Sequence, residues 1–107
     1  QSIPYVNPGK SAKPDALKLV KLYPNPFNPT VTLTYDLAAM SDLYVSIYNL
    51  AGEQVWNHAK GSHPAGQNYT LTWNGNDLTN SPLPSGIYLV NIQAGTQIKS
   101  EKVTLLR

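Results

Sequence analysis

Apolar and polar side chains alternate along much of this sequence, and a period of two residues is typical of β-strands. The clearest example is the stretch 31–37, in which the four odd-numbered residues are apolar, whereas the even-numbered residues are two threonines and Asp36. Such a stretch predicts a half-buried strand of an antiparallel sheet, with one face in the core and the other facing solvent.

Other stretches show the same period or are rich in β-branched and aromatic residues, and clusters of Gly, Asn, Asp, Ser and Pro separate them. The expected strands are 17–22, 31–37, 43–50, 53–58, 68–74, 86–93 and 97–106. Between them we expect a turn at 49–52, in which Gly52 supplies a positive φ, a loop at 60–66 and a long connection at 74–85. Short strands at this spacing, without a helical period, predict an all-β fold: a seven-stranded immunoglobulin-like antiparallel β-sandwich.

The segment 23–30 is interrupted by Pro24, Pro26 and Pro29. Proline fixes φ and lacks a backbone N–H, so this segment is expected to be extended, stiff and unable to serve as a central strand. Phe27 is the one side chain in it suited to anchoring the segment onto a core. We therefore predict that this segment crosses one edge of the β domain and that Phe27 holds it there.

The first 18 residues follow neither the strand period nor the helix period. They contain several prolines, scattered lysines and serines, and a glycine, a composition typical of a semi-extended spacer. We expect residues 1–18 to link an absent upstream domain to a domain at 19–107.

Composition excludes several classes of function. The chain has 107 residues, enough for one domain with a modest core. A net charge of +2 with 13% charged residues makes nucleic acid an unexpected partner. Because the chain has no cysteine, it has no disulfide or thiolate site, and no apolar run reaches the length of a transmembrane segment.

Several motifs occur in a fixed order along the chain, ending with Lys102-Val-Thr-Leu-Leu-Arg107. Together they resemble the C-terminal sorting domains of the type IX (Por) secretion system, and equally the immunoglobulin-like domain of flagellar hook-capping proteins. The resemblance covers about residues 19–107. Where relatives often have a glycine after the tryptophan motif, this chain has Asn80, which can also adopt a left-handed conformation. The residues that carry the pattern are Pro24, Asn25, Pro26, Phe27, Asn28, Pro29, Gly52, Trp73, Gly75, Gly86 and Tyr88.

The resemblance implies a non-catalytic module without a cofactor. It would direct its parent exported protein through the outer-membrane type IX translocon to the cell surface or medium, and a sortase-like peptidase would often remove it afterwards. The translocon and that peptidase are the implied partners.

The last strand is the expected recognition element, because an edge strand can offer its backbone groups to a partner strand. Its charged side chains would supply polar contacts, although charge on an edge strand also protects it against aggregation. The candidate recognition residues are Lys99, Lys102, Val103, Leu105 and Arg107.

The sequence gives little indication of a metal site or a catalytic site. His58 and His63 have no third ligand nearby, so both are expected to be surface histidines. Ser62, His63 and Asp77 lack the turn that activates a nucleophile, so no triad is expected. The asparagines around Asp77 add no second carboxylate, so turn chemistry is favoured over a calcium site; these asparagines are Asn74, Asn76 and Asn80.

The main alternative is a carbohydrate-binding accessory module of a secreted glycoside hydrolase. Tyr44, Tyr48 and Trp56 could form a flat aromatic platform for sugar rings. Packing of these side chains in the core or at an edge is the simpler interpretation, since a two-sheet sandwich needs aromatic filler. A structural immunoglobulin-like spacer is the third alternative.

Overall fold

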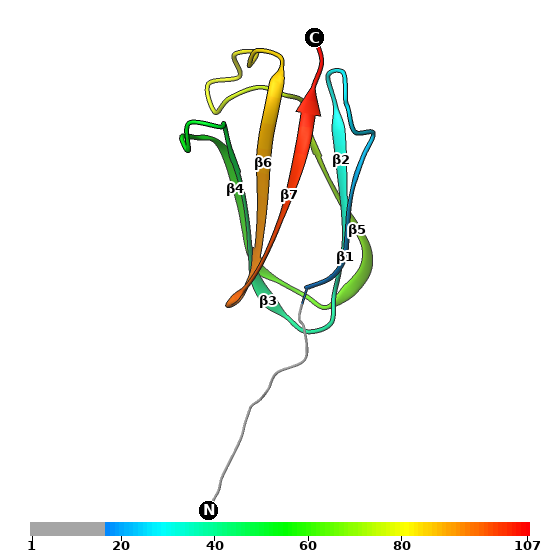
Figure 1. Cartoon of the computed structure of the whole chain (residues 1–107). Coiled ribbons are helices and arrows are strands. Elements are labelled where there is room, and N and C mark those ends of the chain that lie inside the picture. The colour runs from blue at the N-terminus through cyan, green and yellow to red at the C-terminus, as the bar shows by residue number, and fades with distance from the viewer. Residues whose placement is uncertain (1–16) are drawn as a thin grey trace, which may run out of the picture.

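The computed structural model describes residues 17–107, and the predictions for residues 1–16 lie outside the described residues. This part of the chain consists of strands, turns and loops, and holds no helix that could cross a membrane (Figure 1). The strands are β1 (Leu17–Tyr23), β2 (Val31–Leu37), β3 (Ser41–Tyr48), β4 (Gln54–His63), β5 (Gly66–Trp73), β6 (Gly86–Ala94) and β7 (Gln97–Leu105).

The strands form two antiparallel sheets that pack against each other as a sandwich. One sheet has the order β1-β2-β5 and the other the order β4-β3-β6-β7. The all-β, seven-stranded sandwich expected from the sequence is therefore confirmed. Each strand runs in the opposite direction to the strand before it in the sequence. Every second connection therefore lies at the same end of the sandwich, together with the C-terminus: these are the segments 24–30, 49–53 and 74–85, at the upper end in Figure 1.

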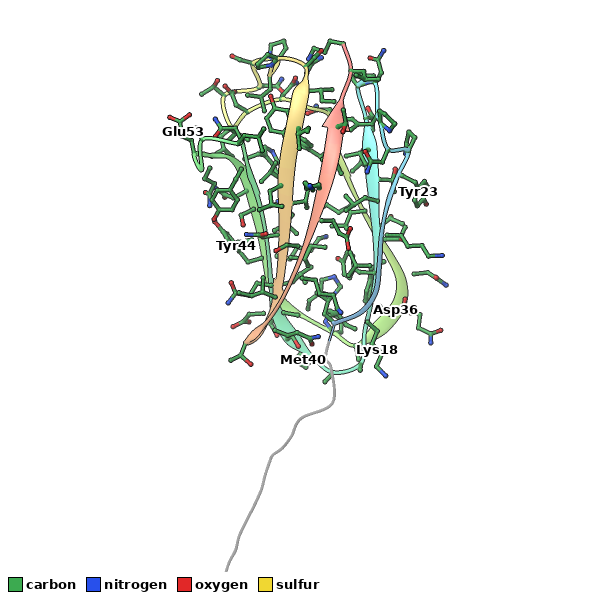
Figure 2. The ribbon with its side chains drawn as sticks, in the orientation of Figure 1. Lys18, Tyr23, Asp36, Met40, Tyr44 and Glu53 are labelled. Atoms are coloured by element: carbon green, nitrogen blue, oxygen red, sulfur yellow. The ribbon has the colours of Figure 1, made fainter. Side chains whose placement is uncertain are left out.

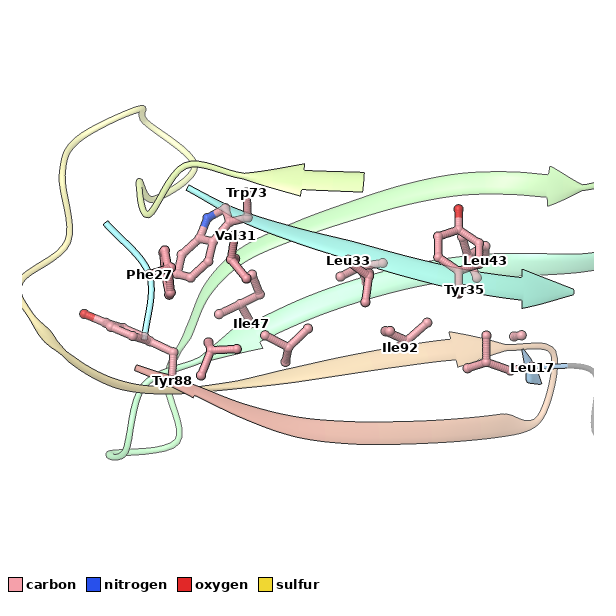
Figure 3. Packing of buried hydrophobic residues seen from close by; sticks show 14 of the residues in the cluster. Leu17, Phe27, Val31, Leu33, Tyr35, Leu43, Ile47, Trp73, Tyr88 and Ile92 are labelled. Carbon is pink, nitrogen blue, oxygen red and sulfur yellow. The ribbon is translucent and has the colours of Figure 1, made fainter. Parts of the chain in front are cut away.

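The core lies between the sheets and is built from the inward residues of the alternating strands (Figure 3). In β2 the burial alternates strictly, and the apolar face predicted for 31–37 is the buried one. Burying this apolar face provides the main drive for the two sheets to associate. The core consists of Leu17, Phe27, Val31, Leu33, Tyr35, Leu37, Leu43, Val45, Ile47, Trp73, Tyr88, Val90, Ile92, Ala94, Val103 and Leu105.

β4 is longer than the sequence indicates, and the predicted loop at 60–66 is wrong. The register passes from Tyr44 opposite Ala59 to Leu43 opposite Gly61, so Lys60 is an extra residue in a β-bulge. Gly61 has a φ of 66°, which a glycine adopts without strain. The strand therefore continues through the bulge, and only residues 64 and 65 connect it to β5.

Leu17, the first described residue, already belongs to the sandwich, whereas the sequence places the start of the domain at residue 19. Leu17 is fully buried, and its backbone N–H donates to Gln97 Oε1 at 2.9 Å. Its carbonyl accepts a bond from Gln97 Nε2 at 3.3 Å. These contacts join the first strand of one sheet to the last strand of the other.

Candidate functional site

The motif residues converge at the upper end of the sandwich, around an aromatic cluster. Phe27 is 1% exposed, and its ring centroid lies 5.6 Å from that of Trp73. Trp73 packs edge-on against Tyr88 at 5.7 Å (Figure 3). The indole N–H of Trp73 donates to the carbonyl of Asn76, and the hydroxyl of Tyr88 donates to the carbonyl of Pro84. Phe27 is thus the buried anchor expected from the sequence.

The proline segment is pinned to the free edge of β7. Phe27 N–H donates to the carbonyl of Thr104, and Leu106 N–H donates to the carbonyl of Phe27, both at 2.9 Å. The side chain of Asn25 also binds the backbone of β7: it donates to the carbonyl of Lys102 and accepts from the N–H of Thr104. The segment therefore occupies the part of the β7 edge that a partner strand would need.

Arg107 closes the same end by capping the connection 74–85. Its guanidinium donates to the carbonyls of Gly75 and Leu83, and its backbone N–H donates to Ser85 Oγ. Gly75 has a φ of 75°, and a Cβ there would lie 2.9 Å from the Arg107 guanidinium and 3.2 Å from the Pro29 carbonyl. Only glycine satisfies both the backbone conformation and the available space.

The connection 74–85 is held by turn chemistry, as expected. Asp77 Oδ1 accepts bonds from the backbone and hydroxyl of Thr79 and from the N–H of Ser81. The bonds from Thr79 and then Ser81 lower the pKa of Asp77. Asn80 has a φ of 66°, so it does take the left-handed conformation expected of it. Its Oδ1 accepts a bond from Asn76 Nδ2.

The two remaining motif glycines have different surroundings. Gly52 has a φ of 85° in the β3–β4 turn, where Asn49 Oδ1 accepts bonds from the N–H groups of Ala51 and Glu53. Gly86 opens β6, and a Cβ there would meet nothing within 4 Å. The positive φ explains why position 52 is a glycine, whereas the space around position 86 would accommodate a side chain.

The five candidate recognition residues do not form one exposed surface. Val103 and Leu105 are fully buried, so the folded domain cannot present their side chains to a partner. Arg107 binds within its own chain. Lys102 is exposed on the outer face of β7. Lys99 is half-buried and lies on the opposite face of the strand, the face that carries Val103 and Leu105.

The structure does not bring Tyr44, Tyr48 and Trp56 together on one face, which contradicts the alternative of a three-residue aromatic platform. Trp56 lies opposite Ile47 in the register and packs against the core, with its ring 6.4 Å from that of Trp73. Tyr44 and Tyr48 alternate with the buried residues Leu43, Val45 and Ile47 of β3 and so lie on the outer face of the four-stranded sheet. Tyr44 is labelled in Figure 2. Hydrogen bonds with Ser46 and Gln54 lower the pKa of Tyr48.

The outer face carries a groove of about 390 Å³ that the sequence analysis missed. Outward apolar residues on β6 were the available signal, because Ile87 and Leu89 alternate with the buried residues of that strand. Tyr48, Leu89 and Lys102 lie in one row across β3, β6 and β7. The lining includes Leu50, Ile87 and Asn91.

His63 is buried, not on the surface as expected; His58 is exposed. His63 is 8% exposed, and Nε2 lies 3.1 Å from the Tyr35 hydroxyl. Because the Pro64 carbonyl can only accept, Nδ1–H donates to it, and in the neutral imidazole Nε2 accepts from Tyr35. Burial, with a smaller effect of Tyr69, raises the pKa of Tyr35 to about 12.

The described residues contain no group of three metal-ligating side chains. His63 and Asp77 lie at opposite ends of β5, so the Ser62, His63 and Asp77 combination is not assembled.

Comparison with known proteins gives a consistent result. The family model of the secretion system C-terminal sorting domain matches residues 21–105. No curated protein matches the sequence. Among solved structures, dimeric latent PorU from Porphyromonas gingivalis is similar at a TM-score of 0.72 and 18% identity, over 96% of this chain and 10% of that chain.

Two further structures share the fold. PorZ from Porphyromonas gingivalis, an essential surface component of the type IX secretion system, matches at a TM-score of 0.58 and 22% identity, over 82% of this chain and 11% of that chain. FlgD from P. aeruginosa matches at 0.54 and 24% identity, over 70% of this chain and 57% of that chain. The chain spans about a tenth of the length of PorU and PorZ. The matched family model covers most of the chain, which therefore belongs to the C-terminal sorting domains that target proteins for type IX export.

Proposed function

We propose that the type IX machinery recognises this domain as a folded unit, and that its last strand acts as part of the fold instead of a free peptide signal. As a sorting domain the chain is a non-catalytic module whose cargo is exported to the cell surface or medium, and interaction with the secretion machinery is implied. The observation that carries the proposal is the burial of β7: Val103 and Leu105 are fully buried.

The proposed contact residues are the two lysines of the last strand. Of the five candidates, Lys102 projects from the outer face and Lys99 is only half-buried. A partner strand could add to β7 only before Lys102, because Asn25 and Phe27 already bind the backbone from Lys102 to Leu106. We assign polar contacts with the translocon to Lys99 and Lys102.

The lead-in and the processing step complete the proposal. The residues before β1 act as a spacer between the cargo and the sandwich, and a sortase-like peptidase removes the domain after export. The support is the proline-rich composition of the lead-in and the burial of Leu17, the first described residue.

The test is export of a reporter fused in front of the whole chain, in a host with a working type IX system. Deleting residues 98–107 would remove most of β7, so point variants separate folding from recognition more sharply. Val103→Asp places an unpaired charge in the core, whereas Ile98→Asp changes a residue on the same strand that is 57% exposed.

We expect the wild type and Ile98→Asp to reach the surface or medium, and Val103→Asp to stay in the periplasm. Circular dichroism of the purified variants shows which are folded. Export of an unfolded Val103→Asp at the wild-type level would contradict recognition of a folded unit. Retention of the wild type would contradict an export role for this chain.

A further inference from the structure

We propose that the groove on the outer face of the four-stranded sheet binds an extended peptide segment of the secretion machinery, one that carries a large apolar side chain close to a carboxylate. The inference rests on the proposed function, because it names the contact through which the folded domain is recognised. It assigns a ligand chemistry to a surface whose lining includes the motif residues Gly52 and Tyr88 but not Phe27, Trp73 or Gly75.

The groove has an apolar floor with one charged group at its side. Ile87 and Leu89 lie two residues apart on β6 and point outward, and Leu50 on the β3–β4 turn is 75% exposed. Exposed apolar groups that cluster over neighbouring strands mark binding surfaces more often than isolated ones do. A volume of about 390 Å³ suits one large side chain and the backbone that carries it.

The charge of the groove selects an acidic partner. Lys102 is the one charged residue among those that line it, and it lies directly across from Leu89. Within residues 17–107, the ammonium group of Lys102 makes no hydrogen bond. The side-chain oxygen of Asn91, which also lines the groove, already accepts a hydrogen bond from the Ser100 hydroxyl. A carboxylate next to the apolar side chain would therefore meet an available ammonium group.

The lead-in of this chain does not supply that carboxylate. Among residues 1–16 the only acidic residue is Asp15, which stands two residues before Leu17. Leu17 lies at the lower end of the sandwich, whereas the groove lies at the upper end of β6 and β7 (Figure 1). Lys10 and Lys13 would also repel Lys102.

A sugar fits the groove less well than a peptide. The apolar part of the lining is mainly aliphatic, formed by Leu50, Ile87 and Leu89. Tyr48 is the one aromatic ring of the lining that faces outward, because Tyr88 is buried in the core. Tyr44 lies four residues from Tyr48 on β3, about 13 Å away in an extended strand, and outside the groove. The surface thus lacks the paired flat rings that sugar stacking uses.

The test uses the same reporter fusion of the whole chain with substitutions in the groove and matched substitutions outside it. Lys102→Glu reverses the charge and Lys102→Arg retains it, while Ile87→Ser removes apolar surface. The controls are Lys60→Glu on the exposed part of β4 and Ile98→Ser on the same outer face. Thermal unfolding of each purified chain confirms that the variants are folded.

We expect Lys102→Glu and Ile87→Ser to lower the exported fraction about tenfold, and Lys102→Arg and both controls to stay near the wild type. Normal export of folded Lys102→Glu and Ile87→Ser would overturn the groove and leave the sorting role intact, whereas retention of the wild type would overturn the sorting role itself. An equal loss with Lys60→Glu would indicate a general charge effect and overturn the acidic partner. Loss with Tyr48→Ala but not with Lys102→Glu would indicate a carbohydrate and also overturn it.

Discussion

The two ends of the sandwich are closed in similar ways but differ in what the sequence reveals of them. At each end a tyrosine hydroxyl donates to a proline carbonyl: Tyr88 to Pro84 at the upper end and Tyr69 to Pro64 at the lower end. The motif end comprises Phe27, Trp73, Gly75, Tyr88 and Arg107, and the histidine end comprises Tyr35, His63 and Tyr69. The family motifs build the first end, whereas residues outside those motifs build the second.

The difference shows what the family pattern encodes. At the motif end the patterned residues pack against each other or pin the backbone of β7, and Phe27 and Trp73 are almost fully buried. The groove proposed for recognition carries few of them. We infer that the motif residues act on export through the stability of the fold, and that contact with the machinery depends on exposed residues such as Lys102 and Ile87.

The largest effect is expected at the aromatic cluster of the motif end. Phe27→Ala leaves a cavity beside Trp73 and should reduce the free energy of unfolding by about 3 kcal/mol. Chemical denaturation of the purified chain measures it. Tyr23→Ala is the control, because Tyr23 lies in the same segment but is 51% exposed and should change stability little. Equal losses for both variants would mean that Phe27 is not the anchor.

The next effect separates backbone conformation from crowding. Gly75→Ala should cost about 2 kcal/mol, because a left-handed backbone disfavours alanine and its Cβ would crowd the Pro29 carbonyl. Gly52 also has a positive φ but has open space around it. Gly52→Ala should therefore cost only about 1 kcal/mol. Denaturation of both variants gives the difference, and a larger loss at Gly52 would refute the crowding at the motif end.

The histidine end should respond to alkaline pH in a way the motif anchor Phe27 does not. The pKa of Tyr35 is raised from its ordinary value of 10.0 to about 12 in the fold. A raised pKa means that the folded state keeps the proton longer, so this contribution is fully present below pH 10 and is lost as the pH rises towards 12. The loss is on the order of 2 kcal/mol. Tyr35→Phe should remove this pH dependence, measured as the difference in unfolding free energy from wild type across that range; an unchanged slope would contradict it.

The sequence predicts the motif end better than the histidine end for a physical reason. Alternation and proline chemistry place Phe27 and the strand 31–37 correctly, because both depend on local geometry. The stretch Lys60-Gly61-Ser62 has the composition of a loop, yet it continues β4 through a bulge. One extra residue reverses which side chains face inward, so His63 enters the core.

In the candidate site, too, the features that depend on local geometry are predicted and those that depend on strand pairing are not. Turn residues around Asp77 were predictable from composition, as was the edge crossing at Phe27. The inward position of Trp56 depends on its pairing with Ile47. The groove depends on the pairing of β3 with β6, two strands that are distant in the sequence. Strand order is a property of the whole fold, and alternation along one strand does not contain it.

The smallest effect concerns the clamp on β7. Asn25→Ala removes two hydrogen bonds to the backbone of that strand and should cost about 1 kcal/mol. Asn28→Ala is the matched control, because Asn28 is exposed and its side chain makes no hydrogen bond within residues 17–107. Amide hydrogen exchange measures the result at Thr104, whose N–H donates to Asn25 and should exchange faster only in Asn25→Ala. Equal exchange in both variants would show that Asn25 does not hold the edge.

The most direct test of the account compares the exported fraction with the folded fraction for variants from both ends. The series consists of Phe27→Ala, Gly75→Ala, Asn25→Ala and Tyr35→Phe in the reporter fusion, with stability measured on the purified chains. We expect one common relation, in which export falls only as the folded fraction falls, whichever end of the sandwich carries the substitution. A motif-end variant that stays folded yet loses export would contradict it, because the machinery would then be reading the motif residues themselves.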